Sequence, residues 1–130
     1  MRSKTEVAAI KQDELRLERA RPGHCELIWR WANDPVVRAA SFSSDRIPWD
    51  AHVAWFEERL RSASCIWFVA LDGLDAPVGQ VRFDLQNDRE AVINLSISSS
   101  HRGLGIGRRL ISSAVERLFQ STAVRTVHAY

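Results

Sequence analysis

The spacing of apolar and polar residues along the first half of the chain predicts one strand and two helices. Residues 15–20 alternate between apolar and charged side chains, which is typical of a half-buried strand. Apolar side chains then recur every three or four positions over residues 23–33 and again from Pro48 onward, which indicates two amphipathic helices. Pro35 ends the first helix, because the residue before a proline avoids the helical region, and residues 41–48 are expected to form a loop.

The second half of the chain changes to the shorter period of β-strands. Residues 65–71 form a nearly continuous apolar run, typical of a strand that is covered on both faces. Short turns separate this run from residues 78–85 and 91–97, and the three segments predict an antiparallel meander. A helix over about 107–119 and a last strand over 124–130 complete the pattern. The predicted order, β-α-α-β-β-β-α-β, is that of a mixed α/β domain.

Composition narrows the class of protein without identifying it. The chain has 130 residues, of which 45% are hydrophobic and 26% charged, which suits one globular domain and argues against a disordered chain. The net charge is +2 with arginines scattered throughout, so we expect no nucleic-acid partner. No apolar run reaches the ~20 residues of a membrane span, and the first residues lack the apolar stretch of a secretory signal. We therefore expect no membrane partner and a cytoplasmic location.

The beginning of the chain and its two cysteines carry little functional signal. Residues 1–13 are mostly polar and patternless, and we interpret them as an arm or linker before a domain over 14–130. Cys25 and Cys65 lie in apolar surroundings and lack the C-x-x-C spacing of a redox or metal motif. Two buried free thiols are the expected state, and we predict no metal site.

The glycine-rich segment 95–109 is the stretch with the clearest chemistry. Of the 6 glycines in the chain, three fall here at alternating positions, namely Gly103, Gly105 and Gly107. Glycine lets the backbone approach a bulky anion, and the first N–H groups of the helix that follows have no partner within the helix. These donors and the helix dipole predict a phosphate-binding loop, to which Arg102 and Arg108 could add charged contacts.

Two common nucleotide-binding motifs also contain closely spaced glycines, and this segment fits them less well. A Walker loop needs Lys-Ser or Lys-Thr after its last glycine, whereas Gly107 is followed by Arg108 and Arg109. A dinucleotide-binding unit needs an acidic residue about twenty positions further on, and neither Glu90 nor Glu116 fits that place. On spacing alone, a flexible turn before an ordinary helix stays open.

A family resemblance favours the phosphate-binding loop over the flexible turn. The pattern Arg102-x-x-Gly105-x-Gly107, after a strand and at the start of a helix, resembles the R/Q-x-x-G-x-G/A signature of GNAT acyltransferases. The order of elements over residues 14–130 is also similar to theirs. The resemblance implies an α/β (α+β) fold with a mixed, mainly antiparallel central sheet and helices on both faces.

The same resemblance implies acetyl-CoA (coenzyme A) as the cofactor. Main-chain N–H groups of the loop would bind its pyrophosphate, and the end of the preceding strand would pair with its pantetheine arm. That strand would splay from the last strand and leave a gap where the acetyl group meets the amine. The implied cofactor-binding residues are Leu95, Ser96, Ile97, Arg102, Gly103, Leu104, Gly105, Ile106, Gly107 and Arg108.

The implied activity is that of an N-acetyltransferase, which moves the acetyl group of acetyl-CoA to a primary amine. Neither cysteine is placed as an obvious nucleophile, which favours direct attack by the amine. No general base stands out, and Glu90, Asn94 and His52 are the options, so the catalytic residues stay unassigned.

The acceptor is indicated by a narrower resemblance. Residues 29–35, 41–43, 47–56 and 78–84 resemble a bacterial GNAT branch that acetylates UDP-linked 4-amino-sugars in nonulosonic (pseudaminic) acid synthesis. It implies a nucleotide-linked amino sugar as acceptor, and we expect the sugar pocket to be lined by Phe42, Trp49 and His52. For the other aromatic residues of these segments, Trp29, Trp31, Trp55 and Phe56, the competing interpretation is helix core.

Three further functions stay open at this point. They are a protein N-terminal acetyltransferase of the ribosomal-protein type, a catalytically inactive acetyl-CoA-binding module, and an interaction domain without a ligand. GNAT domains normally continue past the strand at 124–130 with a helix and further strands, so the C-terminal part of the fold is expected to be missing. An open sheet edge invites pairing, and we expect a homo-oligomer or a domain swap there.

Overall fold

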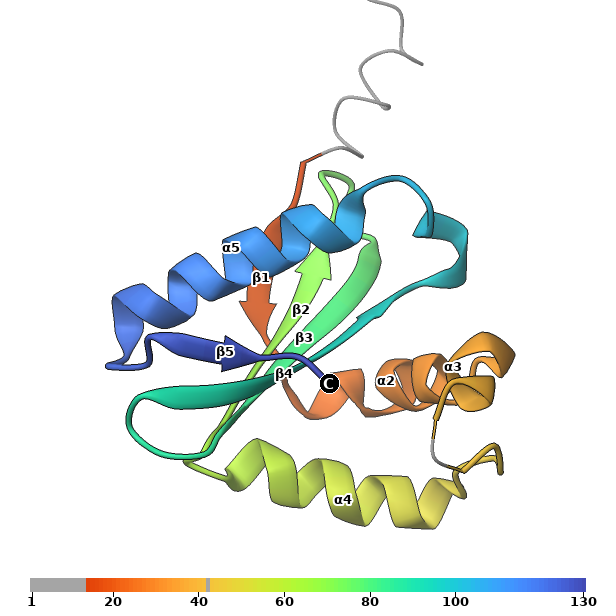
Figure 1. Ribbon diagram of the computed structural model, residues 1–130. Helices are drawn as coiled ribbons and strands as arrows, with labels where there is room; N and C mark the ends of the chain where they lie inside the picture. The colour runs from red at the N-terminus through yellow and green to blue at the C-terminus, as the bar shows by residue number, and fades with distance from the viewer. Residues whose placement is uncertain (1–13, 42) are drawn as a thin grey trace, which may run out of the picture.

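The computed structural model describes residues 14–41 and 43–130 and shows one twisted sheet. Its five strands follow the order β1-β2-β3-β4-β5 across the sheet (Figure 1). Neighbouring strands are antiparallel except β4 and β5, which run parallel. The strands are β1 (Arg16–Arg19), β2 (Cys65–Leu71), β3 (Pro77–Leu85), β4 (Glu90–Ile97) and β5 (Thr126–His128). The predicted mixed, mainly antiparallel sheet is therefore confirmed.

Helices cover both faces of this sheet, as predicted (Figure 1). One side carries α2 (Cys25–Ala32), α3 (Pro35–Ala39) and α4 (Trp49–Arg61), and α5 (Ile106–Ser121) lies alone on the other. Two single 3-10 turns, η1 (Pro22–His24) and η2 (Ser99–His101), precede α2 and the turn into α5. None of the helices among the described residues has both the length and the apolar character to span a membrane.

The structure differs from the predicted order of elements at α3, a helix that the sequence pattern did not indicate. Pro35 was expected only to end a helix, and α2 does end just before it. Pro35 also begins α3, because a proline suits the first helical position, where its missing N–H is not needed. Asp34 caps this new helix, since its carboxylate accepts a hydrogen bond of 3.0 Å from the N–H of Val36. The last strand is also shorter than the predicted 124–130.

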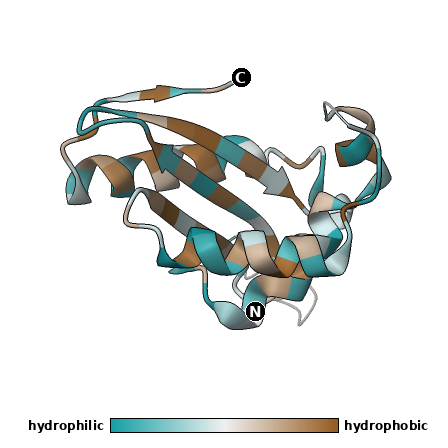
Figure 2. Ribbon diagram, turned by 90° about the horizontal axis from the view of Figure 1, so that it is seen from below, coloured by the Kyte–Doolittle hydropathy of each residue, from teal (hydrophilic) through white to brown (hydrophobic). Residues whose placement is uncertain are grey.

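The period of two along the strands divides their side chains between two clusters. Against α5 lies the larger apolar cluster, in which Val81, Phe83 and Ala91 are fully buried. On the other face Phe56 of α4 packs with Trp67 and other residues of β2. Figure 2 shows hydrophobic and hydrophilic positions alternating along the strands. Each strand therefore faces two different environments.

Both cysteines are free thiols, as predicted. Cys65 is buried in β2, and Cys25 at the start of α2 is half-buried. Burial, with a smaller contribution from the carboxylate of Asp84, raises the pKa of Cys65 to about 11. A thiol held in its protonated form is a poor nucleophile, so Cys65 is a packing residue.

Candidate functional site

The turn between β4 and α5 has a backbone that requires glycine at two positions. Gly103 (φ 79°) and Gly105 (φ 75°) both adopt the left-handed region, which side chains disfavour. A Cβ at either position would meet open space, so the requirement comes from the backbone angle and not from crowding. Gly105 is also the N-cap residue of α5. The turn therefore exposes the start of this helix.

The first N–H groups of α5 have no acceptor in the part of the chain that the structure describes. The first main-chain bond of the helix is donated by Arg109 to the carbonyl oxygen of Gly105, at 3.4 Å. For the main-chain N–H groups of residues 105–108, no acceptor is found within residues 14–41 and 43–130. Unpaired donors at the positive end of a helix dipole form a site for phosphate.

Arg102, the first residue of the sequence motif, already has a partner. Its Nη1 donates to the carboxylate of Asp34, the N-cap of α3, at 3.3 Å. Partial burial opposes ionisation, yet the hydrogen bonds from Val36 N–H and Arg102 outweigh it and lower the pKa of Asp34. This ion pair joins the glycine-rich turn to a helix on the opposite side of the sheet, and the sequence motif alone did not indicate it.

The end of β4 offers unpaired main-chain groups beside this turn. β5 pairs with β4 only where β4 begins, from Glu90 with Thr126 to Val92 with His128. Ser98 N–H donates toward β3, to the carbonyl oxygen of Val78 at 2.9 Å. Because successive residues of a strand point their main-chain groups to alternating sides, those of Leu95 and Ile97 point away from β3. No strand among the described residues pairs with them there.

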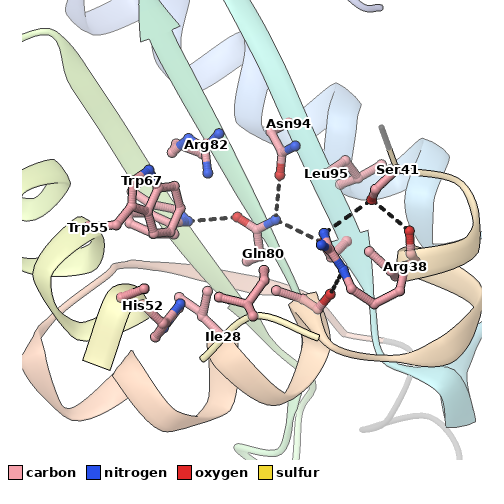
Figure 3. Close-up of a pocket in the computed structure, with 15 residues that line it drawn as sticks. Ile28, Arg38, Ser41, His52, Trp55, Trp67, Gln80, Arg82, Asn94 and Leu95 are labelled. Carbon is pink, nitrogen blue, oxygen red and sulfur yellow. Dashed lines mark hydrogen bonds between the residues drawn. The ribbon is translucent and has the colours of Figure 1, made fainter. Parts of the chain in front are cut away.

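A cavity of about 490 Å³ opens on the α2 and α4 side of the same segment of β4 (Figure 3). Its floor is formed by residues of the three central strands, and its walls by α2, α3, α4 and the loop before α4. The floor residues are Trp67, Gln80, Arg82, Asn94, Leu95 and Ser96. The wall residues are Ile28, Ala32, Val37, Arg38, Ser41, Ile47, Ala51, His52 and Trp55.

Gln80 holds the floor of the cavity in one arrangement. It is only 3% exposed, and its Oε1 accepts a hydrogen bond of 2.6 Å from the indole Nε1 of Trp67. Its Nε2 donates to Asn94 Oδ1 and to Ser96 Oγ, both at 3.0 Å (Figure 3). A buried amide with both ends paired is rigid. The Asn94 amide nitrogen and the Ser96 hydroxyl hydrogen have no acceptor among the described residues and are available to a ligand.

The structure brings together some of the predicted site residues and separates others. Leu95 and Ser96 are among the residues that line the cavity, but the Leu95 side chain packs towards α5, as that of Ile97 does. Both side chains lie 3.8 Å from where a Cβ at Gly107 would lie. His52 lines the cavity. Trp49 does not, because its ring packs edge-on against Trp29 with 5.1 Å between centroids. Phe42 lies outside the described residues.

The three suggested bases differ widely in their positions. Glu90 begins β4, where it lies 3.8 Å from His128 and does not line the cavity. Asn94 lines the cavity, but an amide does not take up a proton. His52 is 2% exposed, and its Nε2 donates to the carbonyl oxygen of Cys25 at 2.8 Å. Burial lowers the pKa of His52, against the opposing effect of that hydrogen bond, and favours a neutral ring.

Gln80, Arg82 and Arg38 are residues of the site that were not predicted from the sequence. The signal for the first two lay in the period of β3, where polar residues alternate with the fully buried Val81 and Phe83. Polar side chains on a central strand that is covered on both faces need partners or a cavity. Nothing in the sequence pattern singled out Arg38, because it belongs to the unforeseen helix α3.

The mixed sheet, in which β4 and β5 part, and the turn with free N–H groups before α5 are typical of an acetyltransferase fold. The model of the Acetyltransferase (GNAT) family matches residues 26–130, and the chain belongs to this family. This confirms the family resemblance that the glycine-rich motif carried. No curated protein matches the chain.

Several solved structures share the fold at low sequence identity. The crystal structure of spermidine N-acetyltransferase from Vibrio cholerae in complex with CoA and spermine is 22% identical, with a TM-score of 0.71 over 79% of this chain. A domain from Methanocaldococcus jannaschii is 19% identical, with a TM-score of 0.77, and the match covers 89% of this chain and 76% of that one. These likenesses support the fold alone. The chain spans 62% of the length of the Vibrio cholerae enzyme.

Proposed function

We propose that the chain is an acetyl-CoA-dependent N-acetyltransferase that acetylates a primary amine bound in the cavity. The observation that carries the proposal is the position of residues 94–96 of β4. They line the cavity, and only a short 3-10 turn separates their strand from the anion-binding turn. One segment of strand therefore borders both the acceptor cavity and the donor site.

The donor site follows from the unpaired main-chain groups. N–H groups between Gly103 and Arg108 would hold the pyrophosphate of acetyl-CoA, where four of them lack an acceptor in the described structure. Leu95 and Ile97 would offer their main-chain groups to the amides of the pantetheine arm, as an added strand does. The thioester would then reach the end of β4 that borders the cavity.

The reaction needs the amine to attack the thioester carbonyl directly. The C–N bond forms, the C–S bond breaks, and the thiolate leaves with its electron pair. The proton that the amine loses ends on this thiolate, through water, so that coenzyme A leaves as the free thiol. A covalent acyl-enzyme is not favoured, because Cys65 is buried with a raised pKa and Cys25 does not line the cavity. Positioning of the two reactants supplies much of the rate, and the Asn94 amide is an available donor for the developing oxyanion.

We infer that the acceptor is a nucleotide-linked amino sugar. The cavity volume of about 490 Å³ suits a ligand of that class, and Trp55, which is 37% exposed, offers an aromatic surface to a sugar ring. A fold neighbour from Vibrio cholerae is a spermidine N-acetyltransferase, so a polyamine is the rival acceptor. No Asp or Glu is among the described residues that line the cavity, which does not favour a polycation.

A thiol-release assay tests this proposal. The chain is incubated with acetyl-CoA and either a UDP-linked amino sugar, spermidine or a peptide with a free N-terminus, and free coenzyme A is measured. We expect release with the amino sugar. Coenzyme A at 100 times its Kd should also stabilise the fold by about 2.7 kcal/mol. If coenzyme A stabilises the fold but no amine leads to its release from acetyl-CoA, the chain is a binding module. If coenzyme A does not stabilise the fold, the assignment as an acetyl-CoA-dependent enzyme is wrong.

The expected pairing of the sheet edge at β5 with a second chain stays a prediction. An exposed strand edge offers unpaired N–H and C=O groups to another chain. Sedimentation of the chain over a range of concentrations tests it, and a monomer throughout would contradict it.

A further inference from the structure

The charged side chains of the cavity all carry one sign. Of the described residues that line it, Arg38 and Arg82 are the two with a permanent charge, and His52 is buried with a lowered pKa. The remaining lining residues are apolar or neutral. A concave surface with guanidinium groups and no carboxylate attracts an anion and repels a cation.

Arg38 is held in place by neutral groups only. Its Nε donates to the carbonyl oxygen of Ala32 at 2.8 Å, and its Nη2 donates to Ser41 Oγ at 3.1 Å. Its Nη1 donates to the carbonyl oxygens of Ser43 and Asp45, at 3.3 and 3.4 Å. Within residues 14–41 and 43–130, no carboxylate lies within ion-pair distance of it. Four bonds therefore fix a guanidinium that no acidic side chain among the described residues balances, and one N–H of Nη2 has no acceptor among them.

Arg82 is fixed in a different way and leaves more donors available. Only its Nε contacts Asp84, at 3.3 and 3.1 Å from the two carboxylate oxygens, and Arg59 shares that carboxylate at 3.4 Å. Its guanidinium lies 5.0 Å from the ring of Trp55 and 5.4 Å from that of Trp67. Nη1 and Nη2 have no acceptor among the described residues, so a rigid, planar pair of donors borders the cavity.

We propose that Arg38 and Arg82 form a subsite for an anionic group, a phosphate or a carboxylate, on the molecule that supplies the amine. The two arginines lie on different sides of Gln80, with Arg82 towards Trp67 and Arg38 beside Ser41 (Figure 3). An anion bound there leaves the amine of the same molecule to reach Asn94 and Ser96 at the end of β4. The subsite rests on the proposed function, and it determines which amines are accepted.

Binding of small anions to the coenzyme A complex tests the subsite. Saturating coenzyme A occupies the turn before α5, so the calorimetric binding of a further anion reports on the cavity. The probes are UDP, inorganic phosphate and glutarate, which separate a phosphate from a carboxylate preference. We expect at least one probe to bind. Arg38→Gln and Arg82→Gln should each weaken its binding about tenfold or more, as the loss of a hydrogen bond to a charged group implies.

A matched control and a charge-retaining variant keep the outcome interpretable. Arg30→Gln removes an arginine that pairs with Glu26 on the exposed surface of α2, and it should leave the anion affinity unchanged. Arg38→Lys keeps the charge and should retain part of the affinity, whereas a purely structural role for Arg38 would give no such rescue. Unchanged coenzyme A affinity in each variant shows that the fold is intact.

Two results would overturn the subsite. One is that coenzyme A binds but none of the three anions binds to the complex. The other is that an anion binds equally well to Arg38→Gln, Arg82→Gln and the unaltered chain. Both leave the acetyltransferase proposal standing, because that proposal fails only if coenzyme A itself does not bind or no amine is acetylated.

Discussion

The two faces of the sheet are built from the same strands and have opposite characters. On the face towards α5, Val81 and Phe83 of β3 are fully buried against Leu110 and Ala114. On the other face the residue between them, Arg82, lines a cavity. Because successive side chains of a strand point to opposite faces, one strand can serve stability on one side and binding on the other. This difference predicts that substitutions one residue apart have different consequences.

The largest effect is expected at Phe83 on the packed face. Phe83→Ala leaves a void in a fully buried position and should lower the free energy of unfolding by about 3–5 kcal/mol. Asn94→Ala, on the cavity face of β4, removes one hydrogen bond from Gln80 and should cost about 1 kcal/mol or less. Urea denaturation of both variants measures the difference. Equal losses of unfolding free energy in the two variants would mean that both faces contribute equally to stability.

The next largest effect is expected at Gln80, where the cavity face also contributes to stability. Gln80→Leu leaves the buried indole N–H of Trp67 without its acceptor, which should destabilise the fold by about 1–3 kcal/mol. It should also raise the KM for the amine, because Asn94 and Ser96 lose their common partner. Gln120→Leu, on the exposed surface of α5, is the control and should change stability by no more than about 0.5 kcal/mol. If the KM for the amine is unchanged in Gln80→Leu, the hydrogen bonds of Gln80 do not contribute to acceptor binding.

The turn before α5 lies on the packed side of the sheet, and we expect its main-chain N–H groups to contribute to cofactor binding. Gly105→Ala places a side chain at φ 75° and should cost about 1–2 kcal/mol in strain. If the turn relaxes to relieve that strain, its N–H groups lose their alignment and acetyl-CoA binds more weakly in a titration. Gly23→Ala has open space and no positive φ, and it should leave cofactor affinity unchanged. A Gly105→Ala variant with unaltered affinity would argue against pyrophosphate binding at this turn.

The smallest effect is a dependence of folding stability on pH, which comes from two buried histidines on the side of the sheet that carries α2 and α4. Burial lowers the pKa of both His24 and His52 below the ordinary value of 6.5, and for His24 it outweighs the nearby Glu18. The folded state favours the neutral rings, so their contribution is complete above pH 6.5 and declines as the pH falls below it. Urea midpoints at pH 7.5 and 5 measure the decline. His52→Gln should make it shallower, and a decline of unchanged slope would exclude His52 as its source.

The sequence predicted those parts of the molecule that depend on local signals. The glycine spacing before α5 indicated a turn with positive φ angles and unpaired helix donors, because both are local properties. That this turn binds an anion stays a prediction. α3 was missed because Pro35 was interpreted as a terminator only, although Asp34 before it supplies a cap. For Phe56, 1% exposed, the helix-core interpretation is correct, whereas its neighbour Trp55 is 37% exposed and lines the cavity.

The polar floor of the cavity could not be predicted in the same way. Gln80 bonds to Trp67 on one neighbouring strand and to Asn94 and Ser96 on the other. These contacts depend on strand register, which a single sequence leaves open. Arg38 lines the cavity because of where α3 packs, and this position could not be predicted from the sequence either.

The contact of Arg82 with two neighbouring indoles supplies the chain with an optical reporter of its own. Trp55 and Trp67 both line the cavity, and their fluorescence responds to the water and charge around the rings. A molecule that enters the cavity displaces solvent from these rings and engages the cation above them. Emission near these tryptophans can therefore follow acceptor entry on the stopped-flow time scale, without any label attached.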